Sequence, residues 1–217
     1  MSYTYVQSNG TNTGNSASAR AVAFGSNVSV GDLIVVAVSQ YFDGTQTITD
    51  TLGNTYTSLP MGQIISPVDS NARGEMFYTI SGGSGANTVT VTPSKSCYMS
   101  VAIAEYSGNA SSSVYDSQNH ASATSASPSS GTVTISNTGS LLVGMTFSAN
   151  NSFSSSAGTG FTQRYTSNTN EPLSYEDGVF NTDTAATFTQ GINGWTCIAA
   201  SFKPTATSSG TQVAWVS

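Results

Sequence analysis

His120 is the only histidine in the chain and the first residue to consider for catalysis. It lies beside a Ser/Ala-rich stretch. Serine is so abundant in this chain that the residues of a Ser-His-Asp triad are present by chance, and no spacing between them indicates a triad. The chain has no Gly-x-Ser-x-Gly motif, which would place a serine nucleophile on a sharp turn. We therefore expect His120 to be a solvated loop residue.

Paired carboxylates would permit glycoside hydrolysis, which uses two of them across the scissile bond. Glu75 and Glu105 each stand alone in a strand-like segment, and Glu176 and Asp177 are adjacent. Because successive side chains on a strand point to opposite faces, the adjacent pair cannot act on one substrate. The spacing predicts no glycosidase and no enzyme.

Glu105 is the most unusual of these acids because it lies on the same face of an apolar segment as Val101 and Ile103. Burial there would require a partner, for which the chain offers the cations Lys203, Arg73 and Arg164. The alternative is a carboxylate in water at the end of a strand.

Metal sites are less clearly indicated. One histidine and two distant cysteines do not match the common zinc ligand sets. Calcium is the one candidate ion, because several aspartates lie in turns with Asn and Gly, whose oxygens calcium prefers. Aspartate also favours turns for conformational reasons alone. These aspartates are Asp43, Asp50, Asp69, Asp116 and Asp177.

Cys97 and Cys197 allow two interpretations. A disulfide would be natural in an exported chain, whereas a protein assembled in the cytoplasm would keep both thiols reduced and buried. Alignment of the two halves of the sequence places Cys197 opposite Val101 rather than Cys97. We therefore expect free thiols.

Aromatic residues beside polar ones could form platforms for sugar rings. We predict Tyr41, Phe42 and Tyr165 as ligand-binding residues, with Tyr115 and Trp195 as further candidates. Core packing is the ordinary alternative for each, and it is favoured for Trp195, which opens an apolar segment.

These residues must be positioned by strands, because the helical period is almost absent. Short Val-, Ile- and Thr-rich runs alternate with Gly, Asn and Asp turns every 8–12 residues, which is typical of an all-β sandwich. Segments 87–92 and 131–136 alternate apolar and hydroxyl residues, as strands with one wet face do. The apolar segments 32–38, 98–106, 141–147 and 195–202 predict central strands.

A weak internal repeat divides the chain. Both halves run in the order buried strand, Gly-aromatic-Thr turn, aromatic strand, Thr-rich strand and small-residue strand. Two tandem domains or one sandwich with repeated halves would fit, and we favour the single sandwich. We expect an N-terminal strand and flexible segment at 1–19, a sandwich at 20–204 with halves 20–108 and 113–204, and a tail with a short strand at 205–217.

The two ends of the chain could bind a partner by adding a strand to the edge of another sheet. The N-terminal candidates are Tyr3 and Tyr5, and the C-terminal candidates are Val213 and Trp215. Pairing within the same molecule is the alternative.

Charge is scarce in this chain. Charged residues make up 7% of 217 residues, against a typical share of about 25%. Five Lys and Arg against eleven Asp and Glu give a net charge of −6, which excludes the basic surface needed for nucleic acid or anionic membrane. No apolar run approaches the ~20 residues that span a bilayer. The N-terminus lacks the pattern of a secretory signal, although a mature exported chain would lack it too.

Several motifs resemble a widespread bacterial and phage jelly-roll, or concanavalin-like, β-sandwich module. In the first half these are GDLIVV at 31–36, TDTLGNTY at 49–56 and AEYSG at 104–108. In the second half they are LLVG at 141–144, GTGFTQR at 158–164 and AASFK at 199–203. Members of this family occur in secreted and virion proteins, and the resemblance implies an antiparallel sandwich without a defined activity.

The resemblance and the missing catalytic motifs favour a non-enzymatic bacteriophage virion protein, a capsid decoration or tail-associated protein on the virion surface. Its partners would be the major capsid or tail protein. We expect a homo-oligomer, with a trimer as one candidate, and no cofactor other than calcium. The alternative is a secreted carbohydrate-binding or adhesion module whose partner is a glycan.

Overall fold

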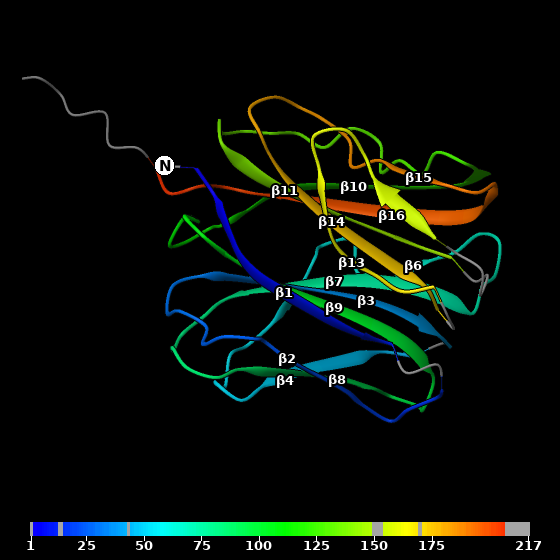
Figure 1. The fold of residues 1–217 in the computed structure, drawn as a ribbon, viewed down its shortest axis with the longest axis horizontal. Helices are drawn as coiled ribbons and strands as arrows, with labels where there is room; N and C mark the ends of the chain where they lie inside the picture. Colours follow the sequence, from blue (N-terminus) through cyan, green and yellow to red (C-terminus); the bar gives the residue numbers. More distant parts are fainter. Residues whose placement is uncertain (1, 13–14, 43, 149–153, 169–170, 207–217) are drawn as a thin grey trace, which may run out of the picture.

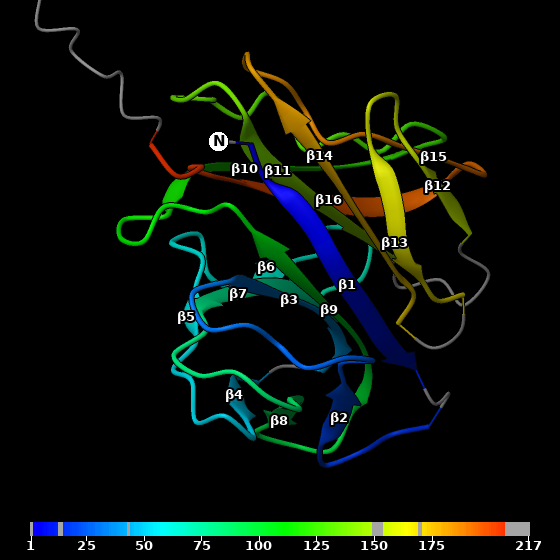
Figure 2. The ribbon, with the colours of Figure 1, turned by 60° about the vertical axis from the view of Figure 1, so that its left-hand side comes forward.

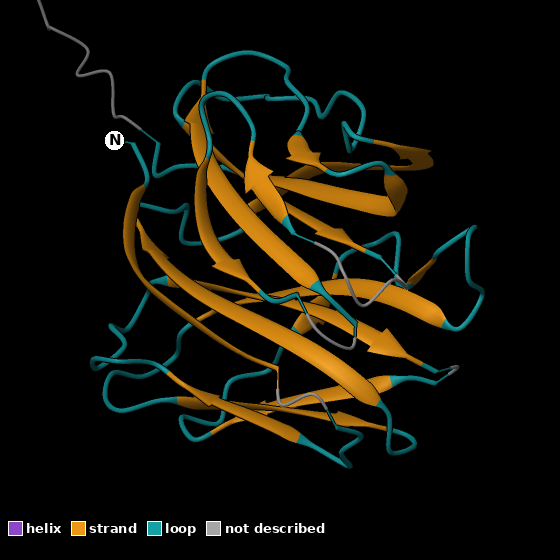
Figure 3. Cartoon of the chain, turned by 45° about the vertical axis from the view of Figure 1, so that its right-hand side comes forward, coloured by secondary structure: helices purple, strands orange, loops and turns teal. Residues whose placement is uncertain are grey.

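The computed structural model describes residues 2–12, 15–42, 44–148, 154–168 and 171–206, and these residues form sixteen strands and no helix (Figure 3). All strand pairs are antiparallel. The prediction of an all-β, sandwich-like architecture is confirmed. No helix able to cross a membrane occurs in the described residues.

The strands form four stacked layers, two large sheets with a smaller outer sheet on each (Figure 1). The first large sheet has the order β1 (Thr4–Asn12), β9 (Tyr98–Ser107), β3 (Leu33–Tyr41), β7 (Ala72–Ile80), β5 (Thr57–Ser58), and β6 (Ile64–Ile65) also pairs with β7. The second large sheet has the order β10 (Tyr115–Ser125), β16 (Asn193–Phe202), β11 (Ser140–Phe147), β14 (Leu173–Phe180), β13 (Thr162–Thr166).

The outer sheets are shorter. The first outer sheet, β2 (Arg20–Ala23), β8 (Thr88–Pro93) and β4 (Gln46–Asp50), covers the first large sheet. The second outer sheet, β12 (Ser155–Ala157) and β15 (Phe188–Gln190), covers part of the second large sheet.

The continuous apolar run of β3 follows from its position between two layers. Leu33, Val35 and Ala37 pack in the core between the two large sheets. Ile34 and Val36 pack instead between the first large sheet and the first outer sheet. Because both faces are covered, alternation disappears and every position from Leu33 to Val38 is apolar.

Segment 131–136 is not the regular strand that its alternating sequence predicts. Val133 makes only an isolated bridge to Thr184. The backbone oxygens of Thr132 and Thr134 accept hydrogen bonds from side chains of β10 instead. Val133 and Ile135 are nevertheless buried, so the alternation correctly predicts the inward face but not the ladder.

The N-terminal segment is part of the first large sheet. β1 pairs with β9 and runs along the edge where the two large sheets meet (Figure 2). The C-terminal prediction, with Val213 and Trp215, lies outside the described residues, which end at Ala206.

Candidate functional site

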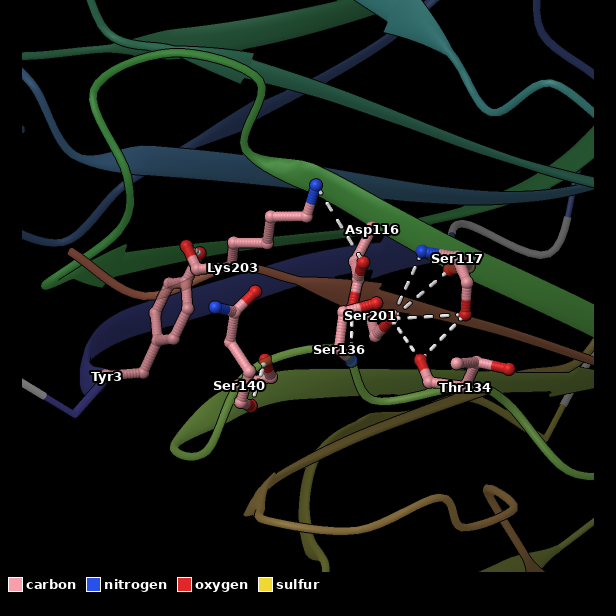
Figure 4. Close-up of polar contacts among 9 residues, drawn as sticks. Tyr3, Asp116, Ser117, Thr134, Ser136, Ser140, Ser201 and Lys203 are labelled. Carbon is pink, nitrogen blue, oxygen red and sulfur yellow. Dashed lines mark hydrogen bonds and ion pairs between the residues drawn. The ribbon is translucent and has the colours of Figure 1, made fainter. Parts of the chain in front are cut away.

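One cavity lies between the N-terminal segment and the residues that follow β16. It has a volume of about 620 Å³, and its lining includes Ser2, Asn137, Lys203 and Ala206. The Lys203 ammonium lies 3.8 Å from Asp116 Oδ1, and the Tyr3 hydroxyl donates to the Lys203 carbonyl at 2.9 Å (Figure 4). The polar contacts of this region therefore tie the N-terminal strand to the end of β16.

A network of hydroxyls extends from that cavity along the bulge of β10. Ser201 Oγ donates to the Thr134 carbonyl at 3.0 Å and accepts the Ser117 N–H at 3.2 Å (Figure 4). Asp116 Oδ2 accepts the Ser136 N–H at 2.9 Å. The hydroxyls and the carboxylate replace missing backbone pairs here, which is a structural role.

Arg164 and Asp177 form a bidentate ion pair at the opposite junction of the large sheets. Arg164 Nε lies 2.7 Å from Asp177 Oδ2 and its Nη2 lies 3.0 Å from Oδ1. The Tyr106 hydroxyl donates to the same Oδ2 at 2.8 Å, and the guanidinium lies over the Tyr5 ring, 3.5 Å from its centroid. Burial lowers the pKa of Arg164, but the hydrogen bonds that its guanidinium donates to Asp177, together with the charge of that carboxylate, raise the pKa above its usual value.

Glu105 is fully buried rather than a carboxylate in water at the end of a strand, and its hydrogen-bond donors Gln7 and Ser29 are not cations. Its oxygens accept the Gln7 amide at 2.6 Å and the Ser29 N–H at 2.9 Å. Asp32 lies beside it. Burial raises the pKa of Asp32 most, the charge of Glu105 and a hydrogen bond with Glu105 raise it further, and the result is a pKa of about 6. Two of the three candidate cations pair with other carboxylates, Lys203 with Asp116 and Arg164 with Asp177. Glu105 has 0% exposure, whereas Asp32 is partly exposed.

Glu176 and Asp177 point to opposite faces of β14, as predicted. Glu176 faces the second outer sheet and accepts the N–H groups of Gly158 and Thr187 at 3.0 and 3.1 Å. Burial raises its pKa to about 8 although both hydrogen bonds lower it. Glu171 is also buried, and burial followed by the charge of Asp69 raises its pKa to about 8.

The aspartates considered for calcium are engaged by hydrogen-bond donors. Asp50 accepts the Asn54 N–H and the side chains of Asn54, Tyr56 and Asn87 at 2.7–2.9 Å. Asp69 accepts the Asn71 N–H at 2.9 Å, and Asp43 lies outside the described residues. In the described ranges no three His, Cys, Asp or Glu side chains gather as metal ligands.

The aromatic residues predicted to bind ligands are not brought together. Tyr41 and Phe42 lie at the end of β3, where Phe42 is exposed and accepts a cation–π contact from Lys95 at 5.0 Å. Tyr165 lies on β13 against β1, half-buried in the core between the large sheets. Trp195 is buried and donates to Ser125, as expected for a core residue.

Tyr115 lies in a second groove, together with Tyr78, which sequence reasoning placed only in a strand. The groove has a volume of about 460 Å³ and is lined by Thr55, Thr57, Tyr78, Thr79, Ile80, Ser113, Val114 and Tyr115. The two rings are nearly parallel, 20° apart, with their centroids separated by 6.1 Å. No sequence signal joins these tyrosines, because they come from β7 and β10 of different sheets.

His120 and the two cysteines do not gather with acidic side chains as metal ligands within the described residues. His120 is exposed on β10 rather than in a loop, and its N–H donates to Asn119 Oδ1. Cys97 and Cys197 are free thiols, as expected, and they lie buried in different clusters.

Comparisons of this chain with protein-family models, with curated proteins and with solved structures find no match. Any function proposed for this chain therefore rests on its side chains and the layers that they build.

Proposed function

We propose that this protein is a non-enzymatic virion surface protein of a bacteriophage, built on a jelly-roll-like sandwich, that works as a homo-oligomer through protein–protein contact. The observation that carries the proposal is where the charges lie. The chain has eleven Asp and Glu, of which Asp43 lies outside the described residues, leaving ten. Each of these ten makes a hydrogen bond within the chain.

At least four of the five Lys and Arg side chains also have a partner within the chain. Arg164 and Lys203 pair with carboxylates, Lys95 lies over a ring and Arg20 donates to the Asn15 carbonyl. The outward positions of the outer sheets carry Thr and Ala instead, as on β2 and β8. A neutral hydroxyl surface allows many copies to pack closely without charge repulsion and without desolvating ions.

Duplication of the two halves would support such a role, because repeated units make extended surfaces. The two large sheets have the same strand order. Leu33 lies opposite Tyr106 in one, and Leu141 lies opposite Phe202 in the other. The edge strands β1 and β10 each have a bulge at the corresponding position, directly after a tyrosine. We infer that the halves are duplicated sandwich units.

Association with particles tests the proposal. The full chain and a truncation to residues 1–206 would be produced during infection, and particles would be purified on a density gradient. The truncation keeps Thr205, whose hydroxyl donates to the Gly108 and Asn109 carbonyls. The contact between the segment after β16 and the turn after β9 is therefore retained. We expect the full chain on particles and a large loss on truncation.

Salt provides a second readout of the same contact. An interface without ion pairs should hold in 1 M NaCl, where the screening length falls to about 3 Å. Absence of the full chain from particles would reject the virion proposal. Full retention of the 1–206 chain would reject contact through the C-terminal segment, and release by salt would reject a neutral interface.

A further inference from the structure

The groove between Tyr78 and Tyr115 has a composition that the proposed virion contact does not require. It lies at one junction of the two large sheets, between β5 and β7 of the first and the start of β10 of the second. We propose that this groove is a binding site for a neutral saccharide. The inference goes beyond the proposed function and is independent of it.

The two rings are held in place before any ligand arrives. Phe202 is fully buried beneath them and meets each ring edge-on, Tyr78 at 5.3 Å and 63° and Tyr115 at 6.5 Å and 78° between centroids. Both tyrosines remain partly exposed. A fixed aromatic surface that water still reaches lets a sugar ring stack with little loss of side-chain entropy.

The groove also offers unused hydroxyl groups and no charge. None of its eight lining residues is ionised at neutral pH. Thr55 and Thr57 are exposed, and within the described residues their hydroxyls and those of both tyrosines make no hydrogen bond. Free hydroxyls around an aromatic platform match the alternating polar edges and apolar faces of a pyranose.

The corresponding groove of the other half is smaller and carries an ion pair. Tyr5 pairs with Tyr106 as Tyr115 pairs with Phe202, and Asp177 occupies the register position of Tyr78. There the guanidinium of Arg164 covers the Tyr5 ring and is fixed by Asp177. A pocket of about 230 Å³ remains beside Arg164, half the volume of the Tyr78–Tyr115 groove at about 460 Å³.

The size and chemistry of the Tyr78–Tyr115 groove favour a saccharide over a peptide. Its volume of about 460 Å³ lies within the ~300–1,000 Å³ of small-molecule sites. No carboxylate or guanidinium lines it to hold a charged chain, and its lining mixes hydroxyl side chains with the apolar Ile80 and Val114. The proposal places carbohydrate binding at Tyr78 and Tyr115, a different position from the sequence-based candidates Tyr41, Phe42 and Tyr165.

Affinity electrophoresis of the full chain tests the site, with β-1,4-glucan, β-1,3-glucan, galactomannan and dextran in the gel and polygalacturonate as the anionic comparison. We expect retardation by at least one neutral polymer. Tyr115→Ala or Tyr78→Ala should weaken it about tenfold, because each removes one of two stacking rings. Thr55→Arg should weaken it similarly by covering the groove from an exposed position.

Controls separate binding from folding. Tyr98→Ala removes a tyrosine that is 40% exposed outside the groove and should change nothing. Tyr78→Phe and Tyr115→Phe keep the rings and should retain most of the affinity. No retardation by any neutral polymer would overturn the proposal, as would retardation by polygalacturonate alone, binding of a polyproline peptide alone, or unchanged retardation of the folded Thr55→Arg chain. Particle association is measured separately, so either proposal can fail alone.

Discussion

The buried carboxyl groups of this chain have surroundings that push their pKa values in opposite directions. Asp50 is partly buried, which raises its pKa, but hydrogen bonds from Asn54, Asn87 and Tyr56 outweigh burial and hold the pKa below its usual range. Glu171 and Glu176 have fewer donors, and burial raises the pKa of each to about 8. Asp50 therefore stabilises the fold as an anion, whereas the two glutamates stabilise it as neutral acids.

Stability should consequently fall as pH rises from about 4.5 to 8. In that range the folded Glu171 keeps a proton that the unfolded chain releases, since 4.5 is the ordinary pKa and about 8 the folded one. The unfolded state then binds fewer protons, so the free energy of unfolding decreases with pH. Glu171→Gln should reduce the fall by roughly 1–3 kcal/mol, as seen by urea denaturation at pH 5 and pH 8.

Asp69→Asn is the matched variant for that prediction. The Asp69 charge adds to the raised pKa of Glu171, so its removal should lower that pKa and shrink the pH effect without abolishing it. Equal pH profiles for the wild type and Glu171→Gln would show that Glu171 is ionised in the folded protein.

Asp50 joins three elements, and its removal should be costly. Asp50→Ala leaves the Asn87 amide and the Tyr56 hydroxyl without their acceptor, and unsatisfied buried donors cost ~1–3 kcal/mol each, so we expect a loss of about 2–4 kcal/mol. Asp183 accepts one backbone N–H at an exposed position, and Asp183→Ala should cost about 1 kcal/mol or less. Similar losses in urea denaturation would contradict a special role for Asp50.

At the scale of elements, the edge strand β1 is held against β13 by a position that requires glycine. A Cβ on Gly10 would lie 2.3 Å from the Tyr165 ring. Gly10→Ala should therefore push β1 away and destabilise the protein by about 1–3 kcal/mol. Tyr165→Ala in the same chain should relieve most of that cost in thermal or urea unfolding.

Gly25→Ala is the control for β1, because its Cβ would meet only the Gln7 amide oxygen, at 4.0 Å. It should leave stability within about 0.5 kcal/mol. Additive effects of Gly10→Ala and Tyr165→Ala would mean that β1 and β13 do not depend on this contact.

Sequence patterns predicted elements well where local chemistry decides them. The apolar runs correspond to β3, β9, β11 and β16. Burial on both faces of a strand requires consecutive apolar residues, which are easily recognised in the sequence. Segment 131–136 differed because β10 side chains took its backbone partners, and no periodicity records such partners. For the same reason the Tyr78–Tyr115 groove was beyond prediction: each tyrosine is visible, but sheet stacking brings them together.

At the scale of the whole molecule, the two halves are joined by their largest core. Leu33, Met76 and Tyr106 of the first large sheet pack in one cluster with Met145, Phe147 and Phe202 of the second. Each large sheet also packs against its own outer sheet, the second through Phe188 of β15 against Trp195 and Cys197 of β16. The halves thus resemble two sandwiches whose principal apolar faces cover each other, with β1 and β10 at the junctions.

This arrangement predicts that neither half is stable alone. A chain of residues 1–108 would expose the apolar face that includes Leu33, Val35 and Met76, and exposed faces of that kind drive association. The full chain should unfold in one transition with coincident fluorescence and circular dichroism curves. Chain 1–108 should elute as an oligomer or aggregate, and adding chain 109–217 should restore a 1:1 complex, because the second sheet covers the same face. A monomeric, cooperatively folded 1–108, or two separate transitions of the full chain, would show that the halves are independent domains.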